Sequence, residues 1–425
     1  MAKNPSKPSK SSKPSAASKA AAPSKRQYDV VLYGATGFVG RQTAAYFANY
    51  QGLPQGFQWA VAGRSADKLQ AVLNDCGATG AGVLIAEAQD AAAMDALARS
   101  ARVVLSTAGP FALYGSALVE ACVRHGTHYV DITGETPWVR GLIDRHHVQA
   151  QSTGAKIIPM CGFDSIPSDL SAFLAQQAMQ AQYGEPCASV KTAFSVRGGF
   201  NGGTLASVLN LLSKGEAQIA ADPFLLNPAG VQPDNVALHT DVVLPRRDAD
   251  FSAWLGPFFM APANTRVVRR SAALLGYGDD FSYQEYLRLG RGPVAALASA
   301  GVSAGTYFAQ IAFKLDAVVA LATKLAPPPG SGPSEASMDA GSFRCEWFGK
   351  SASGHVVRGV VSDKGDPGNR ATTKMVCEAA LALALQSDAL PGGSAAGGLL
   401  TPASGLGQVL VDRLQNAGMT LHVNP

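Results

Sequence analysis

The hydrophobic pattern of the first 165 residues consists of short apolar runs separated by segments that suit helices. The first run, residues 30–33, has the length and composition of a parallel strand that is covered on both faces. Runs of the same kind follow at 58–62, 83–86, 102–107, 128–132 and 156–160. Helix-compatible segments include 41–50 and 115–124. Strands that alternate with helices predict a doubly wound parallel sheet, so we expect a Rossmann-type α/β domain.

The pattern changes beyond this point. Strand-like runs at 189–196 and 241–244 are mixed with Gly- and Pro-rich loops, which predicts a second domain of mixed α/β type. Further elements are expected as strands at 342–348 and 356–361 and as helices at 372–386 and 402–417. The fold class is therefore α/β, with a Rossmann-type sheet followed by a second mixed domain.

Residues 292–313 contain no charged side chain. The stretch is long enough for a membrane-spanning helix, but it consists mostly of Ala, Ser and Gly, whose transfer into lipid gains little free energy. We expect a buried or surface-seated helix pair that continues through 315–325. The Pro- and Gly-rich residues 327–333 then form a break.

A glycine-punctuated turn follows the first apolar run. Gly34 permits a sharp exit from the strand, Gly37 lets the backbone approach a pyrophosphate, and Gly40 lets the following helix pack close to the sheet. That helix would point its first N–H groups at the phosphates. The predicted cofactor contacts of this turn are Gly34, Thr36, Gly37, Phe38, Val39 and Gly40.

The end of the second apolar run indicates which dinucleotide is bound. An enzyme that uses NAD places an Asp or Glu there, on the ribose 2′-hydroxyl. This chain has Arg64, Ser65 and Lys68 instead. Two cations and a hydroxyl suit a 2′-phosphate, which favours NADP(H). An Arg-Ser pair that opens a helix also fits an ordinary helix cap, and this alternative stays open.

The fourth apolar run leads into a loop that should flank the nicotinamide ribose. The loop lies at the strand end where the order of a doubly wound sheet reverses and where dinucleotides bind. Its residues are Ala108, Gly109, Pro110 and Phe111.

Three residues are candidates for the proton donor of a reduction. Tyr114 lies just past the nicotinamide loop, and a phenol with a lowered pKa can donate a proton. Asp164 and Ser165, at the end of the sixth run, are the alternatives. The simpler interpretation is that Tyr114 packs the loop and Asp164 caps the helix after it.

A second glycine-rich segment, residues 197–204, opens an apolar helix. It fits equally well a cradle for an anionic or carbonyl group of a substrate and a hairpin connection. The six cysteines include no C-x-x-C pair and the seven histidines no H-E-x-x-H, so we predict no metal site.

The positive net charge resides in the first 26 residues. Seven of the 35 Lys and Arg residues lie there without any acid, so the rest of the chain has 28 basic and 31 acidic residues. This balance predicts no nucleic-acid surface. The segment has few apolar residues and no hydrophobic core of a secretory signal, so we expect a disordered basic tail.

Several segments occur together in a specific order. They are residues 33–40, 62–65, 108–111 with 114–115, 129–135 and 162–169, and further on 202–207, 365–368 and 401–404. In this combination the chain resembles the saccharopine dehydrogenase-like oxidoreductases, and among them the trans-acting enoyl reductases of glycolipid synthesis. The resemblance implies a Rossmann domain completed by a C-terminal return, a second mixed α/β domain, and reduction linked to NADP(H).

With this resemblance we divide the chain into four parts. These are a basic tail (1–26), an NADP-binding Rossmann domain (27–165), a mixed α/β substrate domain (166–385) and a segment that returns to the Rossmann domain (386–425). We predict an NADPH-dependent oxidoreductase that reduces a lipid-like or acyl substrate, as an enoyl reductase of lipid metabolism. The predicted location is the cytoplasm. Peripheral contact with the plasma membrane and a homodimer are further expectations.

Two alternatives remain. One is an imine reductase that acts on amino acids in the manner of saccharopine dehydrogenase, which needs paired arginines for the substrate carboxylates. Its candidate residues are Arg197, Arg246, Arg247 and Arg266. The other is a membrane-associated protein that holds NADP(H) without turnover.

Overall fold

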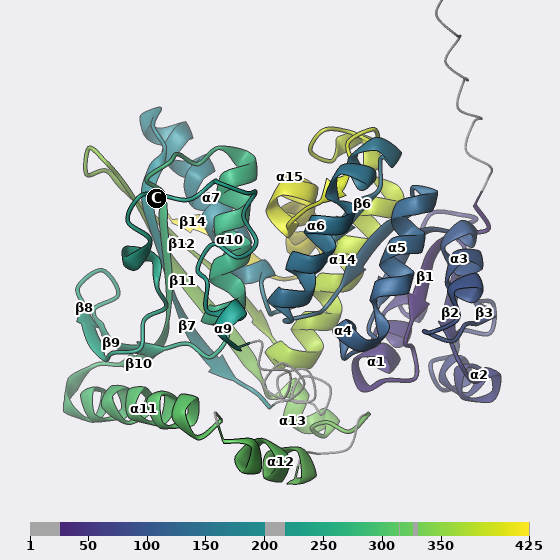
Figure 1. The fold of residues 1–425 in the computed structure, drawn as a ribbon, viewed down its shortest axis with the longest axis horizontal. Helices are drawn as coiled ribbons and strands as arrows, with labels where there is room; N and C mark the ends of the chain where they lie inside the picture. Colours follow the sequence, from purple (N-terminus) through teal and green to yellow (C-terminus); the bar gives the residue numbers. More distant parts are fainter. Residues whose placement is uncertain (1–25, 200–216, 314, 326–329, 425) are drawn as a thin grey trace, which may run out of the picture.

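The computed structural model describes residues 26–199, 217–313, 315–325 and 330–424. Residues 1–25 of the predicted tail and residues 200–204 of the glycine-rich segment lie outside these ranges. Arg26, the last residue of the predicted disordered tail, is instead ordered, because its guanidinium donates to the carbonyls of Ala98, Arg99 and His125. Two seven-stranded sheets form the framework, and they lie side by side in Figure 1. We call them sheet A and sheet B.

Sheet A is parallel throughout and has the strand order β13-β6-β5-β4-β1-β2-β3. Its strands are β1 (Tyr28–Tyr33), β2 (Trp59–Gly63), β3 (Gly82–Ile85), β4 (Ala101–Ser106), β5 (His128–Asp131), β6 (Lys156–Ile158) and β13 (Gly398–Leu399). This order confirms the predicted Rossmann-type sheet. Each predicted run lies within two residues of an observed strand, because a strand buried on both faces is apolar at consecutive positions.

Successive residues of β1 enter two different cores. Val30 and Leu32 pack with side chains of α1 (Phe38–Ala48) and α2 (Ala66–Asp75), whereas Val31 and Tyr33 pack on the opposite face. The helices of that face are α3 (Ala91–Ser100), α5 (Ser116–His125) and α6 (Thr136–Thr153). A single turn of helix, α4 (Phe111–Tyr114), precedes α5, so the helix expected at 115–124 is preceded by a separate short one.

Sheet B is mixed and has the order β14-β12-β11-β7-β10-β9-β8. Its strands are β7 (Cys187–Arg197), β8 (Arg246–Asp248), β9 (Ala253–Pro257), β10 (Ser282–Gly290), β11 (Ser342–Ser351), β12 (Val356–Lys364) and β14 (Thr420–Asn424). Only the pair β7 and β10 is parallel. The helices α7 (Ile166–Tyr183) and α10 (Ala261–Leu275) pack against this sheet.

The strand expected at 241–244 is wrong. These residues have no regular structure, and the strand β8 begins only at Arg246, after Pro245. Val243 and Leu244 are 38% and 71% exposed, so their apolar side chains do not reach a sheet face.

The end of the chain serves both sheets. The helix α14 (Thr372–Leu385) lies before the predicted boundary at residue 386, yet it packs against β1, β4 and β5 of sheet A. Then β13 joins sheet A, α15 (Pro402–Asn416) packs on α14 and α7, and β14 joins sheet B. One hydrophobic core contains side chains from both sheets as a result.

The remaining helices are short or peripheral. They are α9 (Ala217–Ala220), α11 (Gly292–Ala312), α12 (Asp316–Leu325) and α13 (Glu335–Asp339), with η1 (Val236–His239), η2 (Pro367–Ala371) and η3 (Ser387–Ala389). Figure 1 shows α11 and α12 along one margin of the molecule, and α11 packs against β9 and β10.

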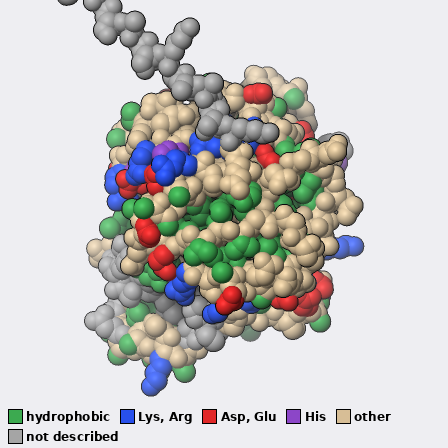
Figure 2. Space-filling view, turned by 90° about the vertical axis from the view of Figure 1, so that its right-hand side faces the viewer, with side chains coloured by type: hydrophobic (Ala, Val, Ile, Leu, Met, Phe, Trp, Pro, Cys, Tyr) green, Lys and Arg blue, Asp and Glu red, His purple; other side chains and the backbone are tan. Residues whose placement is uncertain are grey.

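The side of the molecule with β3 ends sheet A. Ile85 of β3 is 56% exposed there. Figure 2 shows apolar side chains in the middle of this face and charged side chains mostly towards its margins. A doubly wound sheet binds its ligands at the carboxyl ends of its strands, so a site is expected at these ends of sheet A.

Candidate active site

The glycine turn after β1 lies tightly against the loop after β4. Gly34 has a φ of +89°, and a Cβ added to it would lie 2.8 Å from the backbone nitrogen of Ala108. A Cβ on Gly40 would overlap the carbonyl oxygen of Gly34. Only glycine fits both positions, because a side chain would separate the turn from its neighbours.

The helix α1 begins in this turn. Gly37 is its N-cap residue and supplies no side-chain acceptor, so the N–H groups of the first turn, from Phe38 to Gly40, have no partner within the helix. Such N–H groups bind anions, and the helix dipole adds to the attraction. The turn therefore has the geometry that a dinucleotide pyrophosphate requires.

The residues at the end of β2 are exposed, as a 2′-phosphate contact requires. Arg64 and Lys68 lie on the surface, and within the described ranges neither forms a salt bridge. Ser65 is the N-cap residue of α2, but its hydroxyl makes no capping hydrogen bond. A role of Ser65 as an ordinary helix cap therefore does not account for its hydroxyl group.

The same corner contains an acid that the sequence did not single out. Burial, and then the nearby carboxylate of Glu87, raise the pKa of Tyr33 to about 12, while Arg64 acts in the opposite direction. Glu87 follows β3 and is exposed. The cations of this corner therefore share it with the carboxylate of Glu87, and with that of Asp67 in the first turn of α2.

The predicted nicotinamide loop is held by Glu135. Its two carboxylate oxygens accept hydrogen bonds from the backbone N–H groups of Phe111 and Ala112, at 2.8 and 3.0 Å. The Gly109–Pro110 peptide bond is cis. Glu135 is only 3% exposed and lies just after β5, so the carboxyl end of one strand fixes the loop that follows its neighbour. In the sequence, the signal for Glu135 is that an acid follows an apolar run whose strand ends at this same edge of the sheet.

Asp131, the last residue of β5, orders the turn after β6. One of its carboxylate oxygens accepts hydrogen bonds from the N–H groups of Thr133 and Met160, both at 3.0 Å. Met160 has a φ of 65°, which is uncommon outside glycine. Because Asp131 is fully buried, its pKa rises to about 7.

Asp164 lies where the two sheets meet. The ring of Phe163 packs against Phe194 of β7 and Phe343 of β11, with centroids 5.9 and 5.0 Å apart. The backbone N–H of Phe163 donates to Thr372 Oγ1 at 3.0 Å. Asp164 therefore projects from a turn that is fixed by contacts with both sheet B and α14.

The environment of Asp164 favours its protonated form. Desolvation, and then the charge of Asp131, raise its pKa to about 7, although part of the residue is exposed. A carboxyl group with this pKa can donate a proton at neutral pH.

The other two candidate donors differ in access. Ser165 is fully buried, and its hydroxyl donates to Asn264 Oδ1 at 3.3 Å. Asn264 in turn donates to Glu285, so Ser165 belongs to a buried network. Tyr114 ends α4 and is 39% exposed, beside the nicotinamide loop. Access therefore favours Tyr114 and Asp164 over Ser165.

The arginines proposed for carboxylate substrates do not converge. Arg266 is fully buried and pairs with Asp241, while Arg246 pairs with Asp248 at the far edge of sheet B. Arg247 is exposed on β8 and Arg197 is exposed at the end of β7. Within the described residues these four side chains form no paired site.

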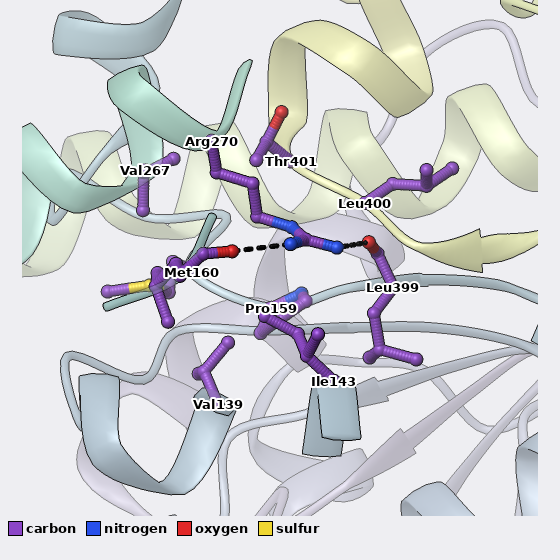
Figure 3. Close-up of a pocket in the computed structure, with 10 residues that line it drawn as sticks. Val139, Ile143, Pro159, Met160, Val267, Arg270, Leu399, Leu400 and Thr401 are labelled. Carbon is purple, nitrogen blue, oxygen red and sulfur yellow. Dashed lines mark hydrogen bonds between the residues drawn. The ribbon is translucent and has the colours of Figure 1, made fainter. Parts of the chain in front are cut away.

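Buried arginines of α10 instead bind main-chain carbonyls. Figure 3 shows Arg270 among the residues that line a narrow cavity. Its guanidinium donates to the carbonyls of Leu226 and Leu399 at 2.5 and 2.6 Å. Desolvation lowers the pKa of Arg270 to about 10. The cavity measures only about 10 Å³, so it holds no substrate. Arg270 therefore joins α10 to β13 through its hydrogen bond to Leu399.

Cysteine and metal chemistry are not visible in this site. All six cysteines are free thiols. Within the described ranges, no group of three or more His, Cys, Asp or Glu side chains is placed to hold a metal ion.

The parallel sheet with its glycine turn, followed by a second mixed sheet, defines the class of the dinucleotide-dependent oxidoreductases. A family model described as the saccharopine dehydrogenase NADP binding domain matches residues 30–158. A Mycobacterium tuberculosis protein, named provisionally as a trans-acting enoyl reductase, is 39% identical over 416 residues, which are 93% of this chain and 97% of that protein. A trans-acting enoyl reductase of Mycobacterium leprae is 36% identical over 428 residues, covering 94% and 98%.

A solved structure shows the same fold. Saccharopine dehydrogenase (L-Glu forming) from Saccharomyces cerevisiae, in its apo form, has a TM-score of 0.51 and 13% identity, and covers 93% of this chain and 99% of its own. The chain therefore belongs to the saccharopine dehydrogenase-like oxidoreductases, in the group of the trans-acting enoyl reductases, and this confirms the resemblance found in the sequence.

Proposed function

We propose that this protein uses NADPH to reduce the carbon–carbon double bond of an α,β-unsaturated acyl substrate. The observation that carries the proposal is the carboxyl group of Asp164, with its pKa raised to about 7, at the junction of the two sheets. The relatives named enoyl reductases support the choice of substrate class. Arg64, Ser65 and Lys68 support NADPH over NADH as the reductant.

Each half of the reaction has its own residues in this proposal. Bound NADPH supplies the hydride that adds to the β-carbon of the substrate. The α-carbon then needs a proton, and protonated Asp164 donates it, with water restoring the acid afterwards. Gly34, Gly37 and the first turn of α1 bind the pyrophosphate, and Glu135 fixes the loop beside the nicotinamide.

The fit between the chain and NADP(H) rests on two observations. The contacts of Gly34 and Gly40, which leave no room for a Cβ, hold the start of α1 close to the sheet, and the first N–H groups of α1 have no partner within the helix. The hydroxyl of Ser65 makes no cap hydrogen bond and stays available for a 2′-phosphate. We also place the enzyme in the cytoplasm, because its six thiols are all free and such thiols persist in a reducing compartment.

The test is NADPH oxidation by the purified full chain with three substrate sets. These are α,β-unsaturated acyl thioesters, 3-ketoacyl thioesters, and mixtures of an amino acid with a 2-keto acid that form imines. We expect oxidation with the first set only, and a product two hydrogens heavier by mass spectrometry. Oxidation with the imine-forming mixtures alone would identify an amino-acid reductase instead. Tight NADPH binding without oxidation in any set would indicate a protein that holds the cofactor without turnover.

A further inference from the structure

The helix α11 exposes its large apolar side chains and buries its small ones. Its buried residues are Ala295, Ser299 and Ser303. They pack on sheet B, where the hydroxyl of Ser299 donates to the carbonyl of Leu255 at 2.6 Å. Its exposed large residues are Val294, Leu297, Tyr307, Phe308 and Ile311. A surface helix of a protein that faces only water has the opposite arrangement.

The same surface continues over α12. Leu315, Leu321 and Leu325 are 59%, 57% and 73% exposed. Eight of the twenty exposed large hydrophobic side chains in the described residues lie between positions 294 and 325, so the exposure is concentrated and not scattered. We call these eight side chains the α11–α12 surface. Figure 1 shows both helices at the outside of the molecule.

The charged residues that flank this surface along the chain are mostly positive. Arg291 precedes α11 and Lys324 lies near the end of α12, and both are exposed. Asp316 is the one acid in the sequence from residue 291 to residue 334, and the exposed Glu335 follows. Cations that flank apolar and aromatic side chains match the anionic headgroups above an acyl layer.

The outward side chains favour lipid over a protein partner. They are Val, Leu, Ile, Phe and Tyr, and α11 itself has no charged residue. A specific protein interface surrounds its apolar centre with polar groups that fix its register, and a lipid surface needs none. A spanning helix is also disfavoured, because α11 is fastened along its small-residue stripe to sheet B.

From these observations we propose that the α11–α12 surface inserts shallowly into an anionic lipid surface. The described chain after α12 contacts the helix that follows the cofactor turn: Gly330 accepts a hydrogen bond from Arg41 of α1 at 3.0 Å, and Gly332 lies against the ring of Phe38. The lipid contact does not rest on the proposed function.

The test measures binding of the full chain to vesicles of phosphatidylcholine, alone and mixed with phosphatidylglycerol. We expect binding to both and tighter binding to the mixture. The double variant Leu297→Ser/Phe308→Ser should bind at least about tenfold more weakly to both, since burial of one side chain of this size changes a partition constant by roughly that factor. Lys324→Glu should weaken binding to the mixture alone.

The matched control is Val148→Ser, because Val148 is 77% exposed on α6, away from this surface. It should bind as the unmodified protein does. Every variant keeps the basic N-terminal segment, so a difference between variants cannot come from that segment. As a second measurement, Phe308→Trp should show a blue shift of tryptophan emission when phosphatidylcholine vesicles are added.

Three results would overturn the proposal. One is the absence of binding to either vesicle. Another is equal binding by the double variant and the unmodified protein. The third is a dimer, found by sedimentation without lipid, that dissociates in the double variant, because the surface would then join two copies of the chain. An unchanged melting temperature in the variants would exclude misfolding as the cause of any of these results. An unchanged NADPH affinity would show that they do not come from a failure of the cofactor assignment.

Discussion

Sheets A and B have equal numbers of strands but differ in how far other elements cover their faces. Sheet A is parallel, and helices cover both of its faces, so function concentrates at the carboxyl ends of its strands. Sheet B is mixed, and its β11 alternates between buried residues such as Trp347 and exposed ones such as Arg344. Sheet A therefore holds the candidate site among close backbone contacts, whereas sheet B exposes part of one face to the surface.

The difference also appears in the glycines. Those of the turn after β1 are enclosed by backbone atoms, as at Gly40, where an added Cβ would overlap the chain. Gly301 of α11, beside sheet B, has no atom within 4 Å of such a Cβ. If this contrast is correct, changes near the strand ends of sheet A should have much larger effects than similar changes around sheet B.

The largest effect is expected at Asp164. Asp164→Asn keeps the shape but removes the acid, so turnover should fall roughly 10²–10⁴-fold while NADPH affinity is preserved. In the unmodified enzyme turnover should decline above pH 7, because the pKa of Asp164 is raised to about 7 and the proton is lost there. Steady-state rates over pH 5.5–8.5 with an active acyl substrate measure both. The companion variant is Tyr114→Phe, and a full loss in it with normal turnover in Asp164→Asn would make Tyr114 the donor.

The next effect concerns the cofactor. Arg64→Ala should weaken NADPH binding by roughly 1.5–3 kcal/mol, the contribution of a hydrogen bond to a charged group, and leave NADH binding nearly unchanged. Arg344→Ala is the matched control on sheet B, since Arg344 is also exposed, and within the described residues its salt bridge is with Glu346. Calorimetric titration gives both affinities. Equal weakening for NADPH and NADH would contradict the assignment of Arg64 to the 2′-phosphate.

A smaller effect separates the glycines. Gly40→Ala should destabilise the protein by roughly 1–3 kcal/mol, because neighbouring backbone must move. Gly301→Ala should raise stability by roughly 0.5–1 kcal/mol, since alanine favours the helix and nothing obstructs it. Thermal melting compares the two variants. A similar loss in both would mean that the region around α11 is packed as tightly as the cofactor turn.

The smallest effect is a gradual dependence of stability on pH. The pKa of Asp131 in sheet A and that of Glu285 in sheet B are both raised to about 7 by burial. Between about pH 4 and 7 the folded chain therefore binds more protons than the unfolded chain, and stability falls as pH rises through 7. We expect a melting temperature a few degrees lower at pH 8 than at pH 6. Glu285→Gln should reduce the difference, and a higher melting temperature at pH 8 would contradict the raised values.

The sequence was sufficient for the framework of sheet A. Its strands are apolar at consecutive positions because helices cover both faces, and each run was therefore visible without the structure. Sheet B was harder to predict, because one-sided burial leaves a weaker pattern. Residues 241–244 were mistaken for a strand for this reason, and β9 and β10 were not resolved from the pattern.

The sequence by itself also determined the glycine turn, the cations after β2 and the absence of charge at 292–313, because these are local properties of neighbouring residues. Only the tertiary structure brought Glu135 to the N–H groups of Phe111 and Ala112, and Thr372 to Phe163 across 209 positions of the chain. Those contacts, together with burial between the sheets, decide which carboxyl group can hold a proton. The outward direction of the large side chains of α11 was likewise settled by packing, because an uncharged helix can bury either side and only the contact with sheet B selects the small one.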